Sequence, residues 1–284
     1  MNSKYIFLND KLVPYSEAKL HVSDLSIQRG YGIFDFLKTL NFHPVFIDDY
    51  LNRFYHSAEE MQLTPPYGRD ELKKHVKFLI EQNGISNSGI KLILTGGFST
   101  DGYNRTEQPN FMMIQTALHP DPSIFEKGLR LITHNYQRQV PSVKTIDYLQ
   151  SIKLWPQVKT QQADDILYHH HGEVRECPRA NIFMIKNKEI FTPKSDILRG
   201  ITRSKVLSLT LEGYEIKEQD FSLEDLFAAD EAFITVTTKN ICPLLQLDGK
   251  AIGNGTAGVI TRQLSDKLLQ LIDEDIRSKK GFDF

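Results

Sequence analysis

Lys144 is the residue of this chain whose type and position are best suited to covalent chemistry. It lies in a short polar stretch that follows an apolar run, 129–133, and precedes an amphipathic segment, 148–158. A lysine at such a strand-to-helix junction can lose its charge once it is desolvated, which prepares its amine for a Schiff base or for proton transfer. Most lysines at element ends are simply solvated, so Lys144 alone does not establish a catalytic function.

Several other groups are of the kinds that would accompany such a lysine. A phosphorylated pyridine aldehyde needs an amine, an acid beside its ring nitrogen, and donors for its phosphate. Glu176 ends a predicted strand and can supply the acid. The run Gly200-Ile201-Thr202 opens a predicted helix, where backbone N–H groups and the helix dipole favour an anion. Thr237 and Arg53 add a hydroxyl and a charged donor.

Each of these groups also has an ordinary interpretation. Glu176 can be a charge at the end of a strand, and Gly200-Ile201-Thr202 can be plain capping. Thr237 can be a strand residue, and Arg53, which lies off the apolar stripe of its helix, can be exposed. The residues alone therefore leave a cofactor site as one hypothesis among several.

Composition limits the functions that the chain can have. The 284 residues are 40% apolar and 25% charged with a net charge of −2, which offers no basic surface for nucleic acid or anionic membranes. No apolar run is long enough to span a bilayer, and no signal peptide opens the sequence. Cys177 and Cys242 lack metal-type spacing, and the adjacent histidines 169–171 alternate between strand faces, so we expect no metal site. We expect a cytoplasmic protein.

Hydrophobic periodicity predicts the elements that position these residues. In the first part of the chain we expect a hairpin over 5–13, strands over 36–40, 90–95 and 111–118, helices over 47–61 and 72–83, and a polar loop over 96–105. In the second part we expect strands over 129–134 and 233–238, a strand, a turn and a strand over 166–176, hairpins over 181–192 and 244–252, and a final helix over 259–272. A proline-rich stretch predicts a linker over 119–127 between domains at 1–118 and 128–284.

Local signals predict how three further helices begin and end. Thr202 is the predicted N-cap of one helix, and Gly213 is its predicted end. Pro156 is expected to kink or interrupt the helix over 148–158. The run Ser222–Asp225 has the pattern of a capping box.

A series of motifs follows the order found in a known enzyme family, over nearly the whole chain. They are Asp24 with Gly30–Asp35, Tyr50–Phe54, Pro141–Thr145 with Tyr148, Gly172–Glu176 with Asn181–Phe183, Leu198–Arg203, and Phe233–Thr238 with Ile241 and Pro243. On these motifs the chain resembles the class IV, fold-type IV pyridoxal-phosphate aminotransferases. That group contains branched-chain aminotransferases, D-amino acid aminotransferases and aminodeoxychorismate lyases.

The resemblance implies a fold and a function. The fold is α+β, with a small α/β sheet domain followed by a larger pseudo-barrel sheet domain with helices, as in D-amino acid aminotransferases. The function is transamination between an amino acid and a 2-keto acid, most similar to that of branched-chain aminotransferases. Three alternatives stay open, namely a lyase that eliminates pyruvate, a D-amino acid aminotransferase and a protein without activity. The family also implies a homodimer.

The resemblance assigns roles to individual residues. Lys144 would form the Schiff base with pyridoxal 5'-phosphate and then act as general base and acid. Glu176 would contact the pyridine nitrogen. The other expected cofactor contacts are Arg53, Tyr148, Ile201, Thr202 and Thr237. The expected substrate contacts are Arg29, Phe34, Tyr103 and Thr238.

Two departures from the family pattern concern the substrate. The first-domain loop has Asp101 and Tyr103 where D-amino acid aminotransferases carry an arginine and a histidine that trap a carboxylate. Arg29 stands where many relatives have an aromatic residue, and an arginine there can bind a second carboxylate. The alternative for Arg29 is an ion pair with Asp24 or Asp35 and no role in substrate binding.

Overall fold

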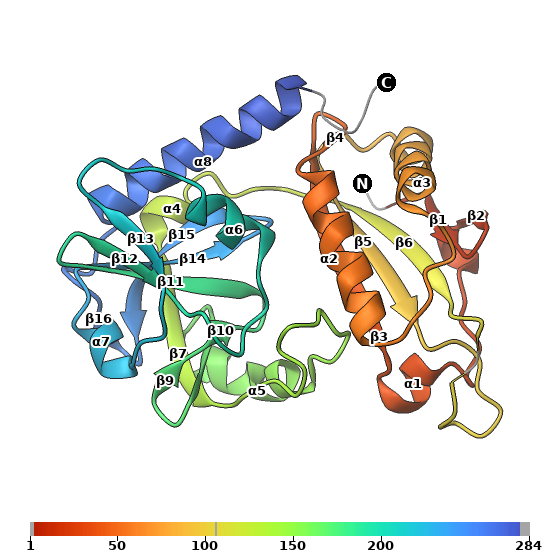
Figure 1. Ribbon diagram of the computed structural model, residues 1–284, viewed down its shortest axis with the longest axis horizontal. Helices are drawn as coiled ribbons and strands as arrows, with labels where there is room; N and C mark the ends of the chain where they lie inside the picture. The colour runs from red at the N-terminus through yellow and green to blue at the C-terminus, as the bar shows by residue number, and fades with distance from the viewer. Residues whose placement is uncertain (1–2, 106, 279–284) are drawn as a thin grey trace. The chain divides into compact units, whose positions relative to one another are not determined.

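The computed structural model describes residues 3–105 and 107–278, which form two compact units (Figure 1). The first unit contains the described parts of Met1–His119, Val143–Asp147 and Ile272–Phe284. The second unit contains Pro120–Ser142 and Tyr148–Leu271. The short segment that carries Lys144 therefore packs with the first unit, although the residues on both sides of it belong to the second.

An antiparallel sheet forms the body of the first unit, with the strand order β2-β1-β6-β5-β3-β4. Its strands are β1 (Tyr5–Leu8), β2 (Lys11–Pro14), β3 (Gly32–Leu40), β4 (His43–Pro44), β5 (Ser88–Thr95) and β6 (Phe111–Ala117). The hairpin predicted over 5–13 is confirmed, and Asn9 adopts the left-handed conformation at its turn, with φ of 54°. The other predicted strands are also present, and β3 begins at Gly32 rather than at Phe36.

Two long helices cover one face of this sheet. The helical elements of the unit are η1 (Tyr15–Glu17), α1 (Leu25–Arg29), α2 (Ile47–Glu60) and α3 (Arg69–Asn83). The rings of Phe54 on α2 and Phe7 on β1 both meet Phe111 on β6 edge-on, and His75 on α3 lies 4.5 Å from Phe7. These aromatic contacts tie both helices to the same side of the sheet. Both helices were predicted, and Gly84 ends α3 in the left-handed conformation.

A larger mixed sheet forms the body of the second unit, with the order β13-β12-β11-β14-β15-β7-β8-β9, while β10 pairs with β11 and β16 with β15. Its strands are β7 (Leu129–Asn135), β8 (Asp165–His170), β9 (Glu173–Val174), β10 (Glu176–Cys177), β11 (Ala180–Lys186), β12 (Glu189–Thr192), β13 (Glu215–Glu218), β14 (Glu231–Val236), β15 (Asn240–Leu247) and β16 (Lys250–Ala251). The hairpins predicted over 181–192 and 244–252 are confirmed. Strand β14 ends at Val236, so the predicted strand over 233–238 is two residues too long. Its last two residues, Thr237 and Thr238, lie in the turn before β15.

The two faces of this sheet have different roles. Ile182 on β11 and Ile234 on β14 point into the main apolar core of the unit. Their neighbours Phe183 and Phe233 point to the other face, because side chains alternate along a strand. There the two rings stack in parallel, 4.9 Å apart at 6°, and both are fully buried. The stack locks β11 to β14 next to the positions where both strands approach α6.

Helices of the second unit begin and end at recognisable signals. They are α4 (Ile124–Lys127), α5 (Leu149–Thr160), α6 (Ile201–Leu207), α7 (Leu223–Phe227) and α8 (Val259–Ser278), the last of which ends among residues of the first unit. The predicted capping box is confirmed, because Ser222 and Asp225 bind each other's backbone N–H groups. Glu231 accepts hydrogen bonds from the N–H groups of Ile260 and Thr261 and thereby caps α8.

The predicted ends of α6 are wrong. The N-cap is Gly200 rather than Thr202, because the extended conformation and the carbonyl of Gly200, which accepts from Ser204 N–H at 2.9 Å, already begin the helix. The helix ends at Leu207, and Ser208 closes it with a side-chain hydrogen bond to the Lys205 carbonyl. Gly213 instead adopts a positive φ in the turn that leads to β13.

Pro156 does not interrupt its helix, so that part of the expectation is wrong. Helix α5 runs from Leu149 to Thr160 with Pro156 inside it. A proline removes the N–H that would bind the carbonyl of Ile152, but Ile152 is 70% exposed, so water can take that hydrogen bond. The cost of the proline is therefore small enough for the helix to continue.

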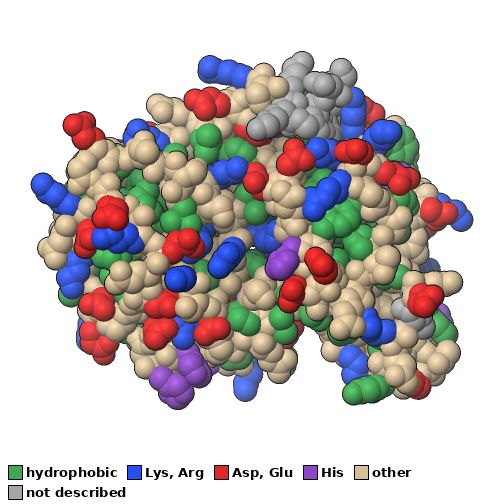
Figure 2. Space-filling view, viewed as in Figure 1, with side chains coloured by type: hydrophobic (Ala, Val, Ile, Leu, Met, Phe, Trp, Pro, Cys, Tyr) green, Lys and Arg blue, Asp and Glu red, His purple; other side chains and the backbone are tan. Residues whose placement is uncertain are grey.

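The two-domain α+β fold predicted from the motifs is confirmed by the two sheets and their helices. On the face drawn in Figure 2, acidic and basic side chains are intermingled rather than gathered into one patch. Within residues 3–105 and 107–278, none of the helices has both the length and the apolar character needed to cross a bilayer. The same residues contain no group of three or more His, Cys, Asp or Glu side chains that could hold a metal ion.

Truncation of the ring stack should destabilise the second unit. Phe183→Ala removes a fully buried ring, and we expect it to lower the free energy of unfolding by about 3–5 kcal/mol, measured by urea denaturation. Phe78→Ala, at a 42% exposed position on α3, is the matched control and should change it by less than about 0.5 kcal/mol. Equal effects of the two variants would contradict the assignment of Phe183 to the core.

Candidate active site

Backbone hydrogen bonds attach the Lys144 segment to β3. The N–H of Phe34 donates to the carbonyl of Lys144 at 2.9 Å, and the N–H of Ile146 donates to the carbonyl of Gly32 at 3.1 Å. This pairing continues the antiparallel pattern of a sheet edge. It fixes the position from which the Lys144 side chain projects.

The Lys144 amine lies over an aromatic ring. Its Nζ is 4.6 Å from the centre of the Phe34 ring, within the range of a cation–π interaction. The backbone N–H of Lys144 also donates to Ser57 Oγ on α2 at 3.4 Å. The structure thus brings together two of the predicted site residues, the catalytic candidate Lys144 and the substrate-contact candidate Phe34.

A buried acid holds the guanidinium of Arg53. Nε donates to Asp35 Oδ2 at 2.9 Å, and Nη2 donates to Asp35 Oδ1 at 2.6 Å. The side chain of Arg53 is only 10% exposed and that of Asp35 is fully buried, so the interpretation of Arg53 as an exposed arginine is wrong. The two parallel hydrogen bonds fix the plane of the guanidinium, which a flexible surface arginine would lack.

The ion pair considered for Arg29 is not formed. Asp35 is bound by Arg53, and Asp24 caps α1 by accepting the N–H of Ser26. Arg29 is exposed, and its Nη1 donates to the carbonyl of Gln28. The expected pairing of Arg29 with Asp24 or Asp35 is therefore wrong, because both acids are already engaged by other donors.

Asp101 organises the polar loop over 96–105. Its Oδ1 accepts the N–H groups of Asn104 at 2.8 Å and Tyr103 at 2.9 Å, and the hydroxyl of Ser99 at 3.1 Å. These hydrogen bonds, those from the Asn104 and Tyr103 backbone above all, hold the pKa of the Asp101 carboxyl below its ordinary value. Tyr103 itself is 79% exposed. Asp101 shapes the loop, and Tyr103 projects from it.

Glu176 is a buried carboxylate with a donor on each oxygen. Nε of Arg138 donates to Oε1 at 2.8 Å, and the N–H of Leu198 donates to Oε2 at 3.0 Å. Glu176 is 5% exposed. Charged and backbone donors on both oxygens favour the ionised carboxylate over the acid. Arg138 was not singled out from the sequence, because a lone arginine in an irregular segment carries no distinguishing pattern.

Asn181 connects Glu176's strand to the start of α6. Its Nδ2 donates to the carbonyl of Leu198 at 2.7 Å, and its Oδ1 accepts the N–H of Gly200 at 3.1 Å. A Cβ on residue 200 would lie 2.2 Å from Asn181 Oδ1, so a larger residue there would displace the Asn181 amide. Within the described residues, the N–H groups of Ile201 and Thr202 have no acceptor. These two predicted phosphate contacts therefore present unpaired donors at a helix start.

A buried hydroxyl lies beside this helix start. Thr235 on β14 pairs directly with Asn181 on β11, so both side chains lie on the same face of the sheet. Thr235 Oγ1 is buried and has no hydrogen-bond partner among the residues that the structure describes. Such an orphaned hydroxyl is costly unless a ligand or water completes it. Thr237 and Thr238 follow in the turn after β14, and both are half-buried.

The groups of the second unit fit a ligand with a basic ring nitrogen and an anionic end. Glu176 matches the nitrogen, while the N–H groups at the start of α6 and the Thr235 hydroxyl match the anion. Tyr148, the remaining predicted contact, is half-buried at the N-cap of α5. In the first unit, the structure groups Lys144 with Phe34 and leaves Arg29 and Tyr103 exposed.

Comparison with known proteins gives the same answer as the motifs. The sequence model of the family described as "Amino-transferase class IV" matches residues 32–247, and the chain belongs to this family. A "Putative branched-chain-amino-acid aminotransferase" of Methanocaldococcus jannaschii is 32% identical over 97% of both chains. A D-alanine aminotransferase of Listeria innocua is 28% identical, over 94% of this chain and 96% of that protein. The crystal structure of a branched-chain aminotransferase from Thermoproteus uzoniensis with norvaline has a TM-score of 0.86 at 25% identity and covers 98% of this chain and 97% of that one.

Low pH should weaken the hydrogen bonds by which Asp24, the N-cap of α1, holds this helix. Besides Ser26 N–H, Asp24 accepts hydrogen bonds from Thr95 Oγ1 and Asn110 Nδ2, both at 2.7 Å. Burial alone would raise the pKa of Asp24, but these hydrogen bonds outweigh it and hold the pKa below its ordinary value of 3.8. An acid whose pKa is lower in the folded than in the unfolded protein stabilises the fold at a pH above its unfolded-state pKa. That stabilisation is lost as the pH falls through the folded-state pKa.

We therefore expect Asp24→Asn to lower the free energy of unfolding by about 1–3 kcal/mol near neutral pH and by progressively less below about pH 4. Urea denaturation at a series of pH values measures this difference. Asp10→Asn, at an exposed position, is the control. A difference for Asp24→Asn that does not change with pH would show that its charge is not what stabilises α1.

Proposed function

We propose that this chain is a pyridoxal-phosphate-dependent aminotransferase that transfers an amino group between an amino acid and a 2-keto acid. The observation that carries the proposal is the Glu176 carboxylate, which is buried and holds a charged donor on one oxygen and a backbone donor on the other. The membership of the chain in the class IV family supports it. The cofactor, when bound, supplies a carbonyl for a lysine amine and a ring that withdraws electrons from the substrate.

Lys144 is the proposed covalent anchor and proton carrier. Its backbone is hydrogen-bonded to β3, which fixes the point from which the side chain extends. With cofactor and substrate bound, the Lys144 amine would take the proton from the substrate Cα as a base and give it back to a neighbouring carbon as an acid. The Phe34 ring beneath Nζ shields one side of the amine from water.

Glu176 is the proposed partner of the ring nitrogen. A carboxylate that is kept ionised by Arg138 and by Leu198 N–H holds a proton on a nearby nitrogen base. That proton makes the ring a better electron acceptor. Glu176 thus acts without changing its own charge.

The proposed phosphate contacts are of three kinds. Arg53 supplies a guanidinium whose plane is fixed by Asp35. Ile201 and Thr202 supply backbone N–H groups at the start of α6. Thr237 supplies a hydroxyl and N–H group from the turn after β14, and Tyr148 is the remaining proposed cofactor contact.

The proposed substrates are branched-chain-type amino acids and their keto acids. The likeness to the 32% identical Methanocaldococcus jannaschii protein supports this choice. Arg29, Phe34, Tyr103 and Thr238 are the proposed substrate contacts. Asp101 cannot act as a carboxylate trap, because it is itself an acid and binds backbone N–H groups of its own loop.

We also infer a cytoplasmic homodimer. Cys177 and Cys242 are both free and buried, which is usual for a reducing compartment. Family membership supports the dimer, and sedimentation of the purified protein measures it.

Borohydride reduction after incubation with pyridoxal phosphate tests the proposed anchor. The reduced cofactor should be found on a peptide that contains Lys144, and the Lys144→Ala variant should carry no label there. Lys153→Ala, at an exposed position on α5, is the matched control and should label like the native protein. A label on another lysine, or no label at all, contradicts the proposal.

A panel of L- and D-amino acids then tests the reaction. We expect branched-chain L-amino acids to convert the bound cofactor to its amine form, seen as a change in absorbance, with release of the matching keto acid. Conversion by D-amino acids alone would indicate a D-amino acid aminotransferase. Release of pyruvate from an aminodeoxychorismate substrate without a second keto acid would indicate the lyase.

Removal of the Glu176 charge should slow the reaction more than it weakens cofactor binding. A glutamine keeps the size of the side chain but cannot hold a proton on the ring nitrogen, so we expect Glu176→Gln to lower kcat by about 10²–10⁴-fold. Single-turnover absorbance measures the loss. Glu224→Gln, at an exposed position on α7, is the control. A Glu176→Gln variant with native kcat would remove Glu176 from the mechanism.

A further inference from the structure

Arg175 is a buried arginine whose side chain the proposed reaction does not use. It lies between β9 and β10, directly before Glu176, and is 7% exposed. Its backbone N–H donates to the carbonyl of Tyr168 at 2.9 Å, so the two residues follow an extended path beside β8. Arg175 and Glu176 are adjacent in sequence, and each side chain makes its own set of hydrogen bonds.

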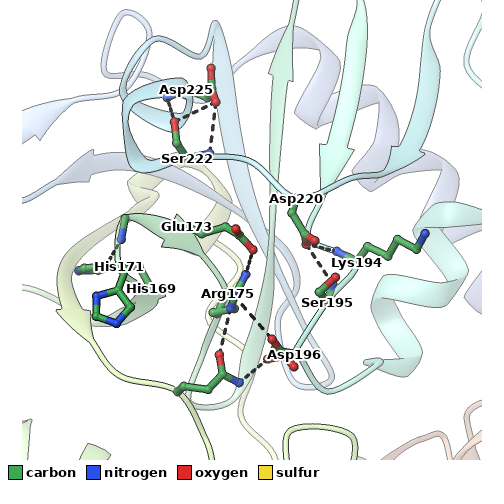
Figure 3. A network of polar contacts seen from close by, with 12 residues as sticks. His169, His171, Glu173, Arg175, Lys194, Ser195, Asp196, Asp220, Ser222 and Asp225 are labelled. Atoms are coloured by element: carbon green, nitrogen blue, oxygen red, sulfur yellow. Dashed lines mark hydrogen bonds and ion pairs between the residues drawn. The ribbon is translucent and has the colours of Figure 1, made fainter.

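The Arg175 guanidinium gathers three acceptors from separate parts of the chain (Figure 3). Nε donates to Gln137 Oε1 at 3.0 Å, Nη1 donates to Glu173 Oε1, and Nη2 lies 3.7 Å from Asp196 Oδ2. Nε2 of Gln137 in turn donates to the carbonyl of Asp196 at 3.1 Å. The contacts form a closed ring that joins residues 137 and 196 to the strand of Glu176.

The segments bound by Arg175 are the segments that supply the donors of Glu176. Arg138, which binds Glu176 Oε1, follows Gln137, and Leu198, which binds Oε2, lies two residues after Asp196. Arg175 and Glu176 thus bind the same two segments. Displacement of either segment would move a donor away from the carboxylate.

The segment between β12 and α6 needs such support. It has no regular secondary structure, and Asp196 within it adopts the left-handed conformation, with φ of 54°, which an aspartate tolerates better than most residues. The N–H groups of Lys194 and Ser195 donate to Asp220 Oδ1 at 2.8 and 3.0 Å, which holds the first half of the segment (Figure 3). Arg175 holds the second half through Asp196, which lies two residues before Leu198 and four residues before Gly200, the N-cap of α6.

The electrostatics of this network agree with that role. Burial alone would raise the pKa of Asp220, but the hydrogen bonds from Ser195 and Lys194 and the charge of Arg175 hold the pKa below its ordinary value. An arginine suits the position because its planar fork donates in several directions at once, whereas a lysine presents a single point charge. The position is unspecified in the Gly-x-Val-x-Glu motif, so the motif does not account for a buried arginine there.

We propose that Arg175 is a positioning residue, which fixes segments 137–138 and 196–198 so that Arg138 and the Leu198 N–H keep the Glu176 carboxylate oriented and ionised. The inference rests on the proposed function only in one respect, that Glu176 contacts the ring nitrogen of pyridoxal phosphate. Its structural part concerns the hydrogen bonds of Glu176 in the protein without cofactor.

Amide hydrogen exchange on the protein without cofactor tests the structural part. In Arg175→Met we expect the N–H of Leu198 to exchange at least about tenfold faster than in the native protein, because the segment that carries this N–H is no longer held beside the Glu176 carboxylate. Arg175→Lys should restore part of the protection. Arg179→Met is the matched control, since Arg179 is 62% exposed and pairs with Asp165 instead, and it should leave the Leu198 exchange rate unchanged.

The state of the ring nitrogen tests the functional part. With pyridoxal phosphate labelled with ¹⁵N in the ring, we expect the native protein and Arg179→Met to hold the nitrogen protonated, and Arg175→Met to shift its resonance toward the unprotonated value. We also expect kcat to fall by about 10–100-fold, the usual effect of removing a residue that orients a first contact, with a smaller change in cofactor affinity. A loss of global stability alone would not move the nitrogen resonance of folded, loaded protein.

The outcomes are separable. Native exchange at Leu198 in Arg175→Met, or a native nitrogen resonance in that variant, overturns the role of Arg175. A native protein that binds no cofactor overturns the proposed function instead, and the exchange rates still decide whether Arg175 holds the Glu176 donors. If Arg175→Met does not fold, Asp196→Asn, at a side chain that is 56% exposed, carries the same measurements with the same expected directions.

Discussion

The second unit depends on keeping one carboxylate charged where water cannot reach it. Glu176 is 5% exposed, and an uncompensated carboxylate in such a place would cost several kcal/mol. Its compensation comes from Arg138 and from the backbone of Leu198, which lie on segments far apart in the chain. The fold must therefore bring three segments to one point. The pairing of β10 with β11 and the hydrogen bond from the Asn181 amide to the Leu198 carbonyl join two of them.

The first unit solves the same problem in a different way. Asp35 is fully buried and is neutralised by the bidentate guanidinium of Arg53, whereas Asp24 is fully buried and accepts only neutral donors among the contacts that anchor α1. In both cases a buried acid at a regular element fixes a neighbouring group. Asp35 on β3 holds the Arg53 guanidinium, and Asp24 holds the start of α1. The Lys144 segment needs no acid for this purpose, because the edge of β3 holds its backbone.

Sequence reasoning succeeded where a signal is local and repeated. The apolar spacing of α2 and the Ser222–Asp225 capping box depend on neighbours a few residues away, and both were predicted correctly. It failed where the outcome depends on a distant partner. Nothing near Arg29 indicates that Asp35 binds Arg53, and nothing near Thr202 indicates that Asn181 accepts the N–H of Gly200 at the start of the helix.

The candidate site shows the same division. Ordered motifs led to Lys144 and Glu176 as candidates, because both lie in stretches that resemble motifs of the class IV family. Arg138 lies in an irregular segment and has no such spacing of its own, so only its 2.8 Å contact with Glu176 reveals it. The orphaned hydroxyl of Thr235 was hidden for a related reason, since a threonine in a strand is ordinary until its missing partner is seen.

The proposed cofactor contacts and the proposed substrate contacts differ in how firmly their surroundings hold them. The residues proposed to hold the cofactor lie on or beside strands and helix starts, and buried partners such as Asp35 and Asn181 hold them. Arg29 and Tyr103, proposed to meet the substrate, lie at the end of the short helix α1 and on an exposed loop. A change at either costs little packing, because exposed side chains contribute little to stability. Selection for a new substrate can therefore act on them while the buried ion pairs stay in place.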